Sequence, residues 1–139
     1  MSTKLKVVLG IIFSVIILVV MVSLSVDTIP PRSLTATRMS VTKRRVIEYA
    51  RIQDHLPINL SVLPSIPGYD AQIEDAWGRT LHYKIDADGN VVLASYGRDG
   101  KPGGEGDDRD MIGVFAPKDS NGKWSDKSAR WLRDPFFKK

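Results

Sequence analysis

An uninterrupted apolar run near the N-terminus, residues 7–26, constrains this chain more than any other feature. It reads VVLGIIFSVIILVVMVSLSV and contains no charged residue. A helix of this length rises ~30 Å, which is the thickness of a membrane's hydrocarbon core. We therefore predict an uncleaved transmembrane helix over 7–26, preceded by a short cytoplasmic N-terminus over 1–6. A cleaved signal peptide is one alternative, because Ser23–Ser25 forms a weak small-residue cleavage site, and a buried helix of a soluble protein is the other.

The distribution of charge does not decide which way such a helix crosses the membrane. Lys4 and Lys6 precede the run, whereas Arg32, Arg38 and the basic triplet 43–45 follow it. The excess of positive residues that marks cytoplasmic segments is thus present on both sides. On charge alone the topology stays open.

The composition excludes several kinds of site. The chain has no cysteine and only two histidines, His55 and His82, so thiolate sites and zinc sites with several histidines are excluded within one chain. The net charge of +4 is too small to indicate nucleic-acid binding. His82 has no catalytic partner in the sequence, and Ser95 lacks the context of an activated nucleophile. We therefore expect a protein that is not an enzyme.

The residues after the apolar run predict an α+β domain over 33–115. Two prolines interrupt the helix and make 27–32 a linker. A long helix is expected over 34–55, capped by Ser33, and the proline-rich stretch 56–68 is expected to be extended and to pack its apolar residues.

Two strands are expected over 80–85 and 90–96, forming a small antiparallel sheet on which the long helix packs. Asp86–Gly89 joins them as a hairpin turn, because Asp-Gly is a strong hairpin signal. The same turn resembles the start of an EF-hand loop, but the twelfth position holds Gly97 in place of an acidic residue.

Two further segments leave alternatives open. Lys43, Arg44 and Arg45 are expected on a solvated face of the long helix, with contact to anionic lipid or to an acidic partner as the alternative. The tail over 116–139 is polar, with a short helix expected over 123–133. Its aromatic residues complete the domain's own core or dock a partner; they are Trp124, Trp131, Phe136 and Phe137.

Residues 97–110, GRDGKPGGEGDDRD, form a loop with five glycines and five carboxylates. The loop has no apolar side chain that could be buried in a core, so another interaction must fix its conformation. Calcium prefers several oxygen ligands on a backbone that can fold around the ion. Two interpretations of the loop therefore stay open at this point: a calcium site, and a solvated acidic loop that holds no ion.

Two spaced motifs make the chain resemble a known family. The first motif is Asp75-Ala76-Trp77-Gly78-Arg79 with Leu81-His82-Tyr83 after it, and the second runs from Ser95 through the glycine-rich loop to Asp110-Met111. Over about residues 34–112 the chain resembles the C-terminal domain of the G-type major pseudopilin of type II secretion. The resemblance implies a long helix packed on a small antiparallel sheet, with a calcium ion in the loop.

The resemblance also implies which residues bind the ion. Asp99 and Asp110 are the best matches to the family's side-chain ligands, and Asp108 is a looser match. The backbone carbonyls near Ser95 and Tyr96 are further candidates.

The N-terminus departs from the family pattern. Pseudopilins carry a short basic leader, cleaved after a glycine, and a glutamate five residues into the mature chain. Gly10 is the only candidate cleavage site here, and Val15 occupies the glutamate position. Pro30 and Pro31 also separate the apolar segment from the helix that follows.

These observations lead to one functional expectation and one alternative. We expect a non-catalytic, pseudopilin-like component of a type II secretion or type IV pilus-related assembly, anchored in the bacterial inner membrane with its domain in the periplasm. Its partners would be other pseudopilins, secretion-assembly proteins or a secreted substrate, and an oligomer is compatible with this role. The alternative is a stand-alone, membrane-tethered module that binds protein and reuses the pseudopilin domain.

Overall fold

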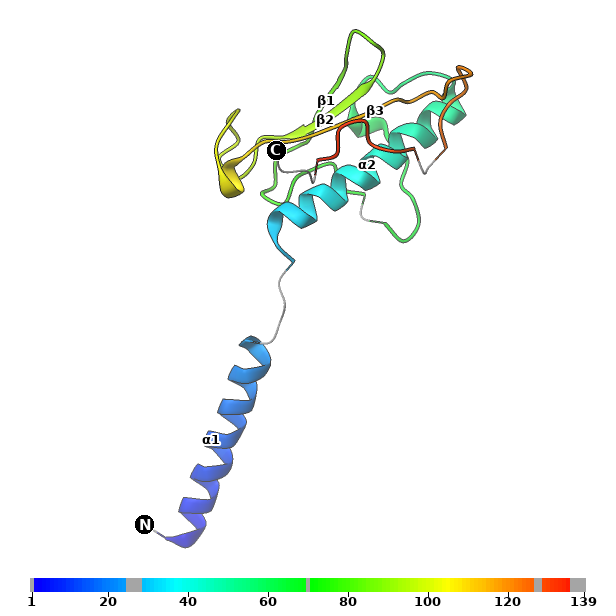
Figure 1. Cartoon of the computed structure of the whole chain (residues 1–139). Coiled ribbons are helices and arrows are strands. Elements are labelled where there is room, and N and C mark those ends of the chain that lie inside the picture. Colours follow the sequence, from blue (N-terminus) through cyan, green and yellow to red (C-terminus); the bar gives the residue numbers. More distant parts are fainter. Residues whose placement is uncertain (1, 25–28, 70, 127–128, 136–139) are drawn as a thin grey trace.

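The computed structural model of the 139-residue chain describes residues 2–24, 29–69, 71–126 and 129–135. Phe136 and Phe137 of the aromatic tail lie outside these residues. Two helices precede a three-stranded sheet, and two single turns of 3-10 helix lie in the connections (Figure 1). In chain order the elements are α1 (Thr3–Leu24), α2 (Pro31–Gln53), η1 (Leu60–Val62), β1 (His82–Ile85), β2 (Val91–Ser95), η2 (Gly106–Asp108) and β3 (Met111–Phe115).

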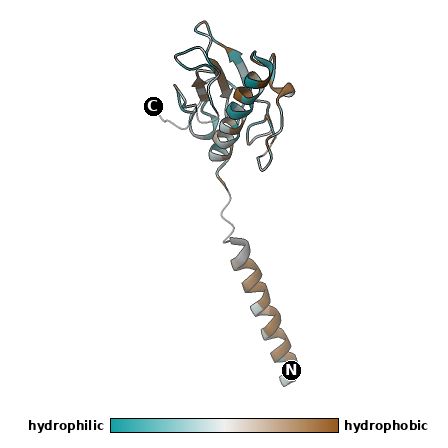
Figure 2. Cartoon of the chain, turned by 90° about the vertical axis from the view of Figure 1, so that its right-hand side faces the viewer, coloured by the Kyte–Doolittle hydropathy of each residue, from teal (hydrophilic) through white to brown (hydrophobic). Residues whose placement is uncertain are grey.

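The apolar run forms α1, which lies apart from the folded domain and is hydrophobic along its length (Figure 2). Its large apolar side chains between Leu5 and Met21 are 44–64% exposed. Among the described residues, no helix was found that is long and apolar enough to span a membrane. The predicted anchor over 7–26 stays a prediction, and residues 25–26 of its range lie outside the described part.

The long helix is confirmed as α2, although it begins and ends earlier than predicted. It begins at Pro31, before the expected cap Ser33, because proline is well tolerated at the first helical position, where no intrahelical partner for an N–H exists. It ends at Gln53, since Asp54 adopts the left-handed conformation with a φ of 60°. The amide of Asp54 closes the helix by donating to the carbonyl of Ala50 at 2.9 Å.

The predicted hairpin is confirmed, and the sheet gains a third strand that was not predicted. The strands lie in the order β1-β2-β3, all antiparallel, with Val92 opposite both Lys84 and Val114. In the turn, the carboxylate of Asp86 accepts the backbone amides of Asn90 and Asp88, and these bonds lower the pKa of Asp86. The strand over Met111–Phe115 alternates buried and half-buried residues, as a strand with one face on a core does.

One hydrophobic core lies between α2 and the sheet, and α2 contacts β2 and β3 (Figure 1). The proline-rich stretch packs into this core as predicted, with Leu60 and Leu63 buried. The hydroxyl of Tyr83 ties the stretch to β1 by donating to the carbonyl of Pro57 at 2.9 Å, and burial raises the pKa of Tyr83 to about 12. The buried core residues are Ala36, Met39, Val46, Ile47, Leu60, Leu63, Leu81, Val91, Leu93, Met111 and Phe115.

The expectation of a solvated basic face on α2 is wrong. Lys43 is 8% exposed and Arg45 is 4% exposed. Arg45 donates to the carbonyls of Leu63, Pro64 and Ala71 at 2.7–3.0 Å. The three prolines of the stretch have no N–H group, and its described residues form no strand, so the guanidinium group supplies donors to carbonyls that no sheet pairs.

Arg44 also makes a specific contact instead of facing bulk solvent. Its guanidinium donates to the hydroxyl of Tyr69 at 2.7 Å and lies 4.7 Å from the centre of the ring of that residue. All three members of the basic triplet are therefore engaged with the rest of the domain.

The tail packs on the outer side of β3, where Trp131 joins the core. Its ring lies 5.6 Å from the ring of Phe115, in edge contact. A Cβ atom at Gly113 would lie 2.5 Å from the ring of Trp131, so only glycine leaves room for it. The amino group of Lys43 lies over Trp131 and donates to the carbonyl of Ala129. Burial lowers the pKa of Lys43, and the nearby charge of Asp134 opposes this shift.

The backbone of the tail also pairs with β3. Val114 and Arg133 form an antiparallel bridge, in which the amide of Val114 donates to Arg133 at 2.9 Å. No helix is found among the described residues of 123–133, so the short helix expected there is wrong for that part. Trp124 contacts the end of α2, because its indole nitrogen donates to the carboxylate of Asp54 at 2.7 Å.

We predict that Trp131→Ala destabilises the domain by about 1–3 kcal/mol, since it removes an aromatic side chain from the core. Leu132→Ala is the matched control, because Leu132 is 65% exposed and should change stability by less than about 0.5 kcal/mol. The measurement is chemical unfolding of both variants and the parent chain. Equal unfolding midpoints for Trp131→Ala and the parent would show that the tail adds nothing to the core.

Candidate functional site

The first motif is organised around a buried carboxylate, that of Asp75. Its Oδ1 accepts the backbone amides of Trp77 and Arg79 at 3.0 Å, and its Oδ2 accepts the hydroxyl of Ser95 at 2.7 Å. The Ser95 hydroxyl oxygen in turn accepts the amide of Gly97 at 3.2 Å. Asp75, which is 2% exposed, thus joins the turn that precedes β1 to the end of β2, where the glycine-rich loop begins.

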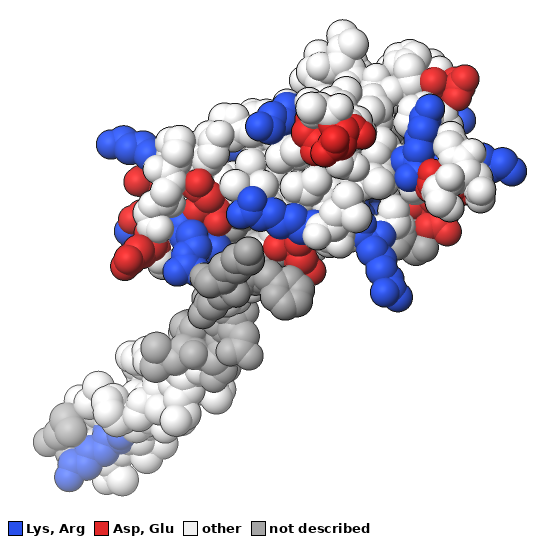
Figure 3. Space-filling model, turned by 45° about the horizontal axis from the view of Figure 1, so that its top comes forward, with Lys and Arg blue, Asp and Glu red and all other residues white. Residues whose placement is uncertain are grey.

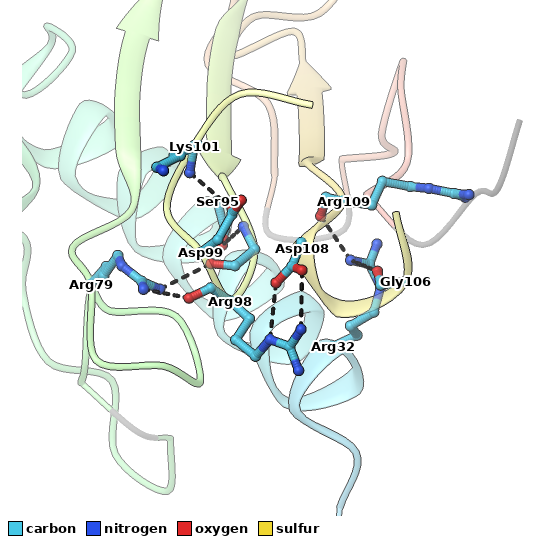
Figure 4. A network of polar contacts seen from close by, with 10 residues as sticks. Arg32, Arg79, Ser95, Arg98, Asp99, Lys101, Gly106, Asp108 and Arg109 are labelled. Atoms are coloured by element: carbon cyan, nitrogen blue, oxygen red, sulfur yellow. Dashed lines mark hydrogen bonds and ion pairs between the residues drawn. The ribbon is translucent and has the colours of Figure 1, made fainter. Parts of the chain in front are cut away.

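Arg79 extends from this turn into the glycine-rich loop (Figure 4). One of its terminal nitrogens donates to the carbonyl of Gly97 at 2.9 Å, and the other donates to the carbonyl of Arg98. Gly100 makes room for this side chain, because a Cβ atom there would lie 2.7 Å from Nε of Arg79. The start of the loop is therefore fixed by a residue outside the loop.

A second arginine, Arg32 in the first turn of α2, reaches the far side of the loop (Figure 4). One of its nitrogens donates to the carbonyls of Gly106 and Arg109 at 3.0 and 2.8 Å. These carbonyls flank the single turn η2. The end of the loop is thereby attached to the N-terminal end of the long helix.

The two sides of the loop also contact each other closely. The amide of Arg98 donates to the carbonyl of Asp107 at 2.8 Å. Cβ atoms at Gly97 and Gly104 would lie 2.7 and 2.6 Å from the carbonyl oxygen of Asp108, so the backbones meet where no side chain fits. Both glycines also have positive φ, which other residues adopt only with strain.

The predicted ligands Asp99 and Asp110 lie on opposite sides of this loop. Oδ1 of Asp99 accepts the amide of Lys101 at 3.0 Å, and Oδ1 of Asp110 accepts the amide of Gly103 at 3.0 Å. Among the residues that the structure describes, the second oxygen of each carboxylate has no hydrogen bond. Each aspartate therefore retains one oxygen that is free to bind an ion.

The predicted ligand Asp108 is engaged differently. Its two carboxylate oxygens accept Nε and Nη2 of Arg98 at 2.9 and 3.0 Å, a bidentate ion pair on the surface (Figure 4). The hydrogen bond from Arg98 and the positive charge of that residue lower the pKa of Asp108. To bind a metal through its side chain, Asp108 would have to leave Arg98.

The remaining candidate ligands were backbone carbonyls near Ser95 and Tyr96. The side chain of Ser95 is committed to Asp75, and the ring of Tyr96 packs against His82 with ring centres 4.3 Å apart. Whether the backbone carbonyls near these two residues bind a cation stays a prediction.

The oxygen atoms of this loop are of the kind that calcium accepts, but fewer carboxylates converge than the sequence suggests. Across residues 2–24, 29–69, 71–126 and 129–135, no group of three or more acidic or histidine side chains is placed to hold a metal. Among the described residues, Asp99 and Asp110 each keep one carboxylate oxygen without a hydrogen bond, whereas both oxygens of Asp108 accept from Arg98. Calcium binding by Asp99 and Asp110 stays a prediction.

A groove of about 690 Å³ lies beside the end of the loop. Gly103, Gly104, Arg109 and Asp110 line it on one side, and the tail lines the other. Basic and acidic side chains are interspersed on the domain face seen in Figure 3, so the charge there is mixed.

Sequence reasoning missed the residues that organise the site: Arg32, Arg79 and the partners of Asp75. Asp75 and Arg79 were quoted only as part of a motif, and Arg32 was placed in a linker. The signal available in the sequence was the motif itself, because an aspartate at position 75 can accept the amides of Trp77 and Arg79 and so form a turn. The bond from Ser95 to Asp75 and the bonds from Arg32 and Arg79 to the loop join distant positions and become visible only in the folded domain.

Comparisons with known proteins agree with the predicted resemblance. Residues 66–114 match the family described as type II secretion system (T2SS), protein G. The chain is also 42% identical over 41 residues to the type II secretion system core protein G of Xanthomonas campestris pv. campestris, a stretch that covers 29% of each protein. No solved structure matched the chain. The resemblance is confirmed for the segment that contains the sheet and the loop.

We predict that Asp75→Ala destabilises the domain by about 2–4 kcal/mol, because it leaves buried amides and the Ser95 hydroxyl without an acceptor. Asp88→Ala, at an exposed turn position, is the matched control and should cost less than about 0.5 kcal/mol. Unfolding by urea measures both. An Asp75→Ala chain as stable as the control would mean that the buried carboxylate does not hold the turn and β2 together.

Proposed function

We propose that this chain, whose residues 66–114 match the protein G family of type II secretion systems, is a non-catalytic, pseudopilin-like component of a type II secretion or related assembly. The observation that carries the proposal is where the match falls. It includes the Asp75 turn, β1, β2, the complete glycine-rich loop and all of β3 except Phe115. Asp75, Arg79 and the loop lie within the segment that matches the family, whereas Arg32 lies outside it.

The proposal includes a membrane anchor in α1. Fourteen large apolar side chains of this helix are exposed, from Leu5 to Met21, and an apolar surface of this extent requires a partner other than water. A helix also satisfies its own backbone, as a segment in lipid must. We place α1 in the bacterial inner membrane and the domain in the periplasm.

Chain length then decides which end of the domain faces the membrane. Six residues separate Leu24 from Pro31, and they can span at most ~20 Å. The N-terminal end of α2 would therefore lie close to the bilayer, together with the loop that Arg32 holds. Contacts with other secretion proteins would use the sides and the far end of the domain.

The proposal also includes one calcium ion in the glycine-rich loop. Asp99 and Asp110 would hold it with their free oxygens, aided by backbone carbonyls of the loop. The ion would supply positive charge among five carboxylates that repel each other. Periplasmic placement supports this, because free calcium in the cytoplasm is too scarce to fill a modest site.

A stand-alone, membrane-tethered binding module is the second candidate. The observation that favours it is Val15, which stands where pseudopilins carry the glutamate used in assembly. The packing of Trp131 on the chain's own β3 weakens the idea that this aromatic residue docks a partner.

The test of the assembly role is purification of the full-length, tagged chain from detergent-solubilised membranes of its native host. We predict that type II secretion components are recovered with it, and that a control chain without residues 2–24 leaves the membrane fraction. Membrane association with reproducible absence of every secretion component would contradict the assembly role and favour the stand-alone module. Recovery of both chains in the soluble fraction would contradict the anchor.

For the ion, we predict that millimolar calcium raises the thermal midpoint of the full-length chain in detergent by roughly ten degrees relative to EDTA. A ligand at a hundredfold excess over its Kd stabilises a folded state by ~2.7 kcal/mol, which corresponds to such a shift for a small domain. Magnesium should not replace calcium.

Two variants localise the effect. Asp99→Ala should abolish most of the rise, whereas Glu105→Ala, a loop carboxylate outside the proposed ligand set, should preserve it. Identical melting curves in EDTA, calcium and magnesium would leave the loop as a solvated acidic turn.

A further inference from the structure

The glycine-rich loop has a source of order that is already present in the chain, namely two guanidinium groups. Arg79 donates to the carbonyls of Gly97 and Arg98, at the start of the loop. Arg32 donates to the carbonyls of Gly106 and Arg109, at its end. Four carbonyls of the loop thus accept from side chains that belong to other parts of the domain (Figure 4).

Both arginines are themselves fixed. The backbone of Arg79 is held on both sides by Asp75, whose carboxylate accepts the Arg79 amide at 3.0 Å and whose amide donates to the Arg79 carbonyl at 2.7 Å. Arg32 lies in the first turn of α2, which the core holds in place. The backbones from which the two side chains extend are therefore held by contacts outside the loop.

Asp110 closes part of the loop by exchanging hydrogen bonds with Gly103, but the other bonds between the two sides of the loop involve neither Asp99 nor Asp110. The two sides meet through the amide of Arg98 on the carbonyl of Asp107, and through the contact of Gly97 and Gly104 with the backbone of Asp108. The ion pair of Arg98 with Asp108 adds a side-chain link between the same two sides. None of these contacts uses the free oxygen of Asp99 or Asp110.

We propose that Arg32 and Arg79 are positioning residues that hold the glycine-rich loop in its course without an ion, and that they set the positions of Asp99 and Asp110. A guanidinium group that donates to two carbonyls performs the closure that a calcium ion was expected to perform alone. Calcium then binds a loop that is already formed. The part about calcium rests on the proposed function, whereas the part about loop order does not.

The experiment measures hydrogen exchange of the loop amides in the full-length chain, in EDTA and in calcium. In the parent chain, the amides of Arg98 and Asp110 should be protected in EDTA, because they donate to Asp107 and Gly103. Arg79→Gln and Arg32→Gln should each raise exchange of the 97–110 segment in EDTA by about tenfold, the effect of losing a pair of hydrogen bonds. Calcium affinity, measured by titration, should fall in both variants.

Arg109→Gln is the matched control. It removes the same charge from the loop, and no hydrogen bond from the Arg109 guanidinium is found among the described residues. It should leave exchange unchanged in EDTA. A rise equal to that of Arg79→Gln would show that net charge, not positioned guanidinium groups, orders the loop, and would overturn the proposal.

Lysine substitutions separate geometry from charge. Arg32 uses a single nitrogen for both carbonyls, so Arg32→Lys should retain most of the protection. Arg79 uses two nitrogens for two carbonyls, so Arg79→Lys should lose about as much as Arg79→Gln. Full protection of the loop amides in Arg79→Lys would contradict the role assigned to the two terminal nitrogens of the Arg79 guanidinium group.

Two further readouts keep the result interpretable. Exchange of the β2 amides should be unchanged in both glutamine variants. If it also accelerates in Arg79→Gln, that substitution has loosened the whole domain. The result for Arg32→Gln then tests whether an arginine orders the loop. A parent loop that is unprotected in EDTA and protected in calcium would overturn the proposal and leave the ion as the ordering agent. A loop protected equally in EDTA and in calcium, with the same melting temperature in both, would contradict the calcium proposal. It would agree with the positioning role of the two arginines.

Discussion

Donation from cationic side chains to backbone carbonyls is the interaction on which the rest of this domain depends. Much of the chain around α2 is neither helix nor sheet, so its carbonyls have no ladder to join. Cationic side chains spaced along α2 each donate hydrogen bonds to carbonyls of a different irregular segment. In order these are Arg32 to the glycine-rich loop, Arg38 to Asp75, Lys43 to the tail and Arg45 to the proline-rich stretch.

This arrangement explains which parts of the fold can be read from the sequence. The helix, the hairpin and the packing of Leu60 and Leu63 follow from local patterns, because spacing and turn chemistry act over a few residues. β3 was missed because it is short, contains Gly113 and follows a loop without apolar residues. The roles of Lys43 and Arg45 were misjudged for a different reason. A charged helix residue normally faces water, and only distant carbonyls that lack donors reverse that preference.

The candidate site divides in the same way. The loop and its family resemblance could be predicted, since glycines and carboxylates cluster in one segment, and Asp99 and Asp110 stay predicted ligands. The closure of the loop could not, because Arg32 lies 77 positions from Arg109 and Arg79 lies 18 positions from Gly97. The ion pair of Asp108 likewise depends on a rotamer of Arg98. The sequence shows which carboxylate oxygens the loop contains, and the fold shows which of them already accept a hydrogen bond.

The cover that the tail places over β3 has a consequence for biosynthesis. An uncovered strand edge pairs readily with strands of other chains, and β3 carries apolar residues on both faces. The segment that covers it, around Arg133, lies C-terminal to the strand. β3 therefore leaves the ribosome before its cover does, and the nascent domain passes through an interval in which it is prone to aggregate.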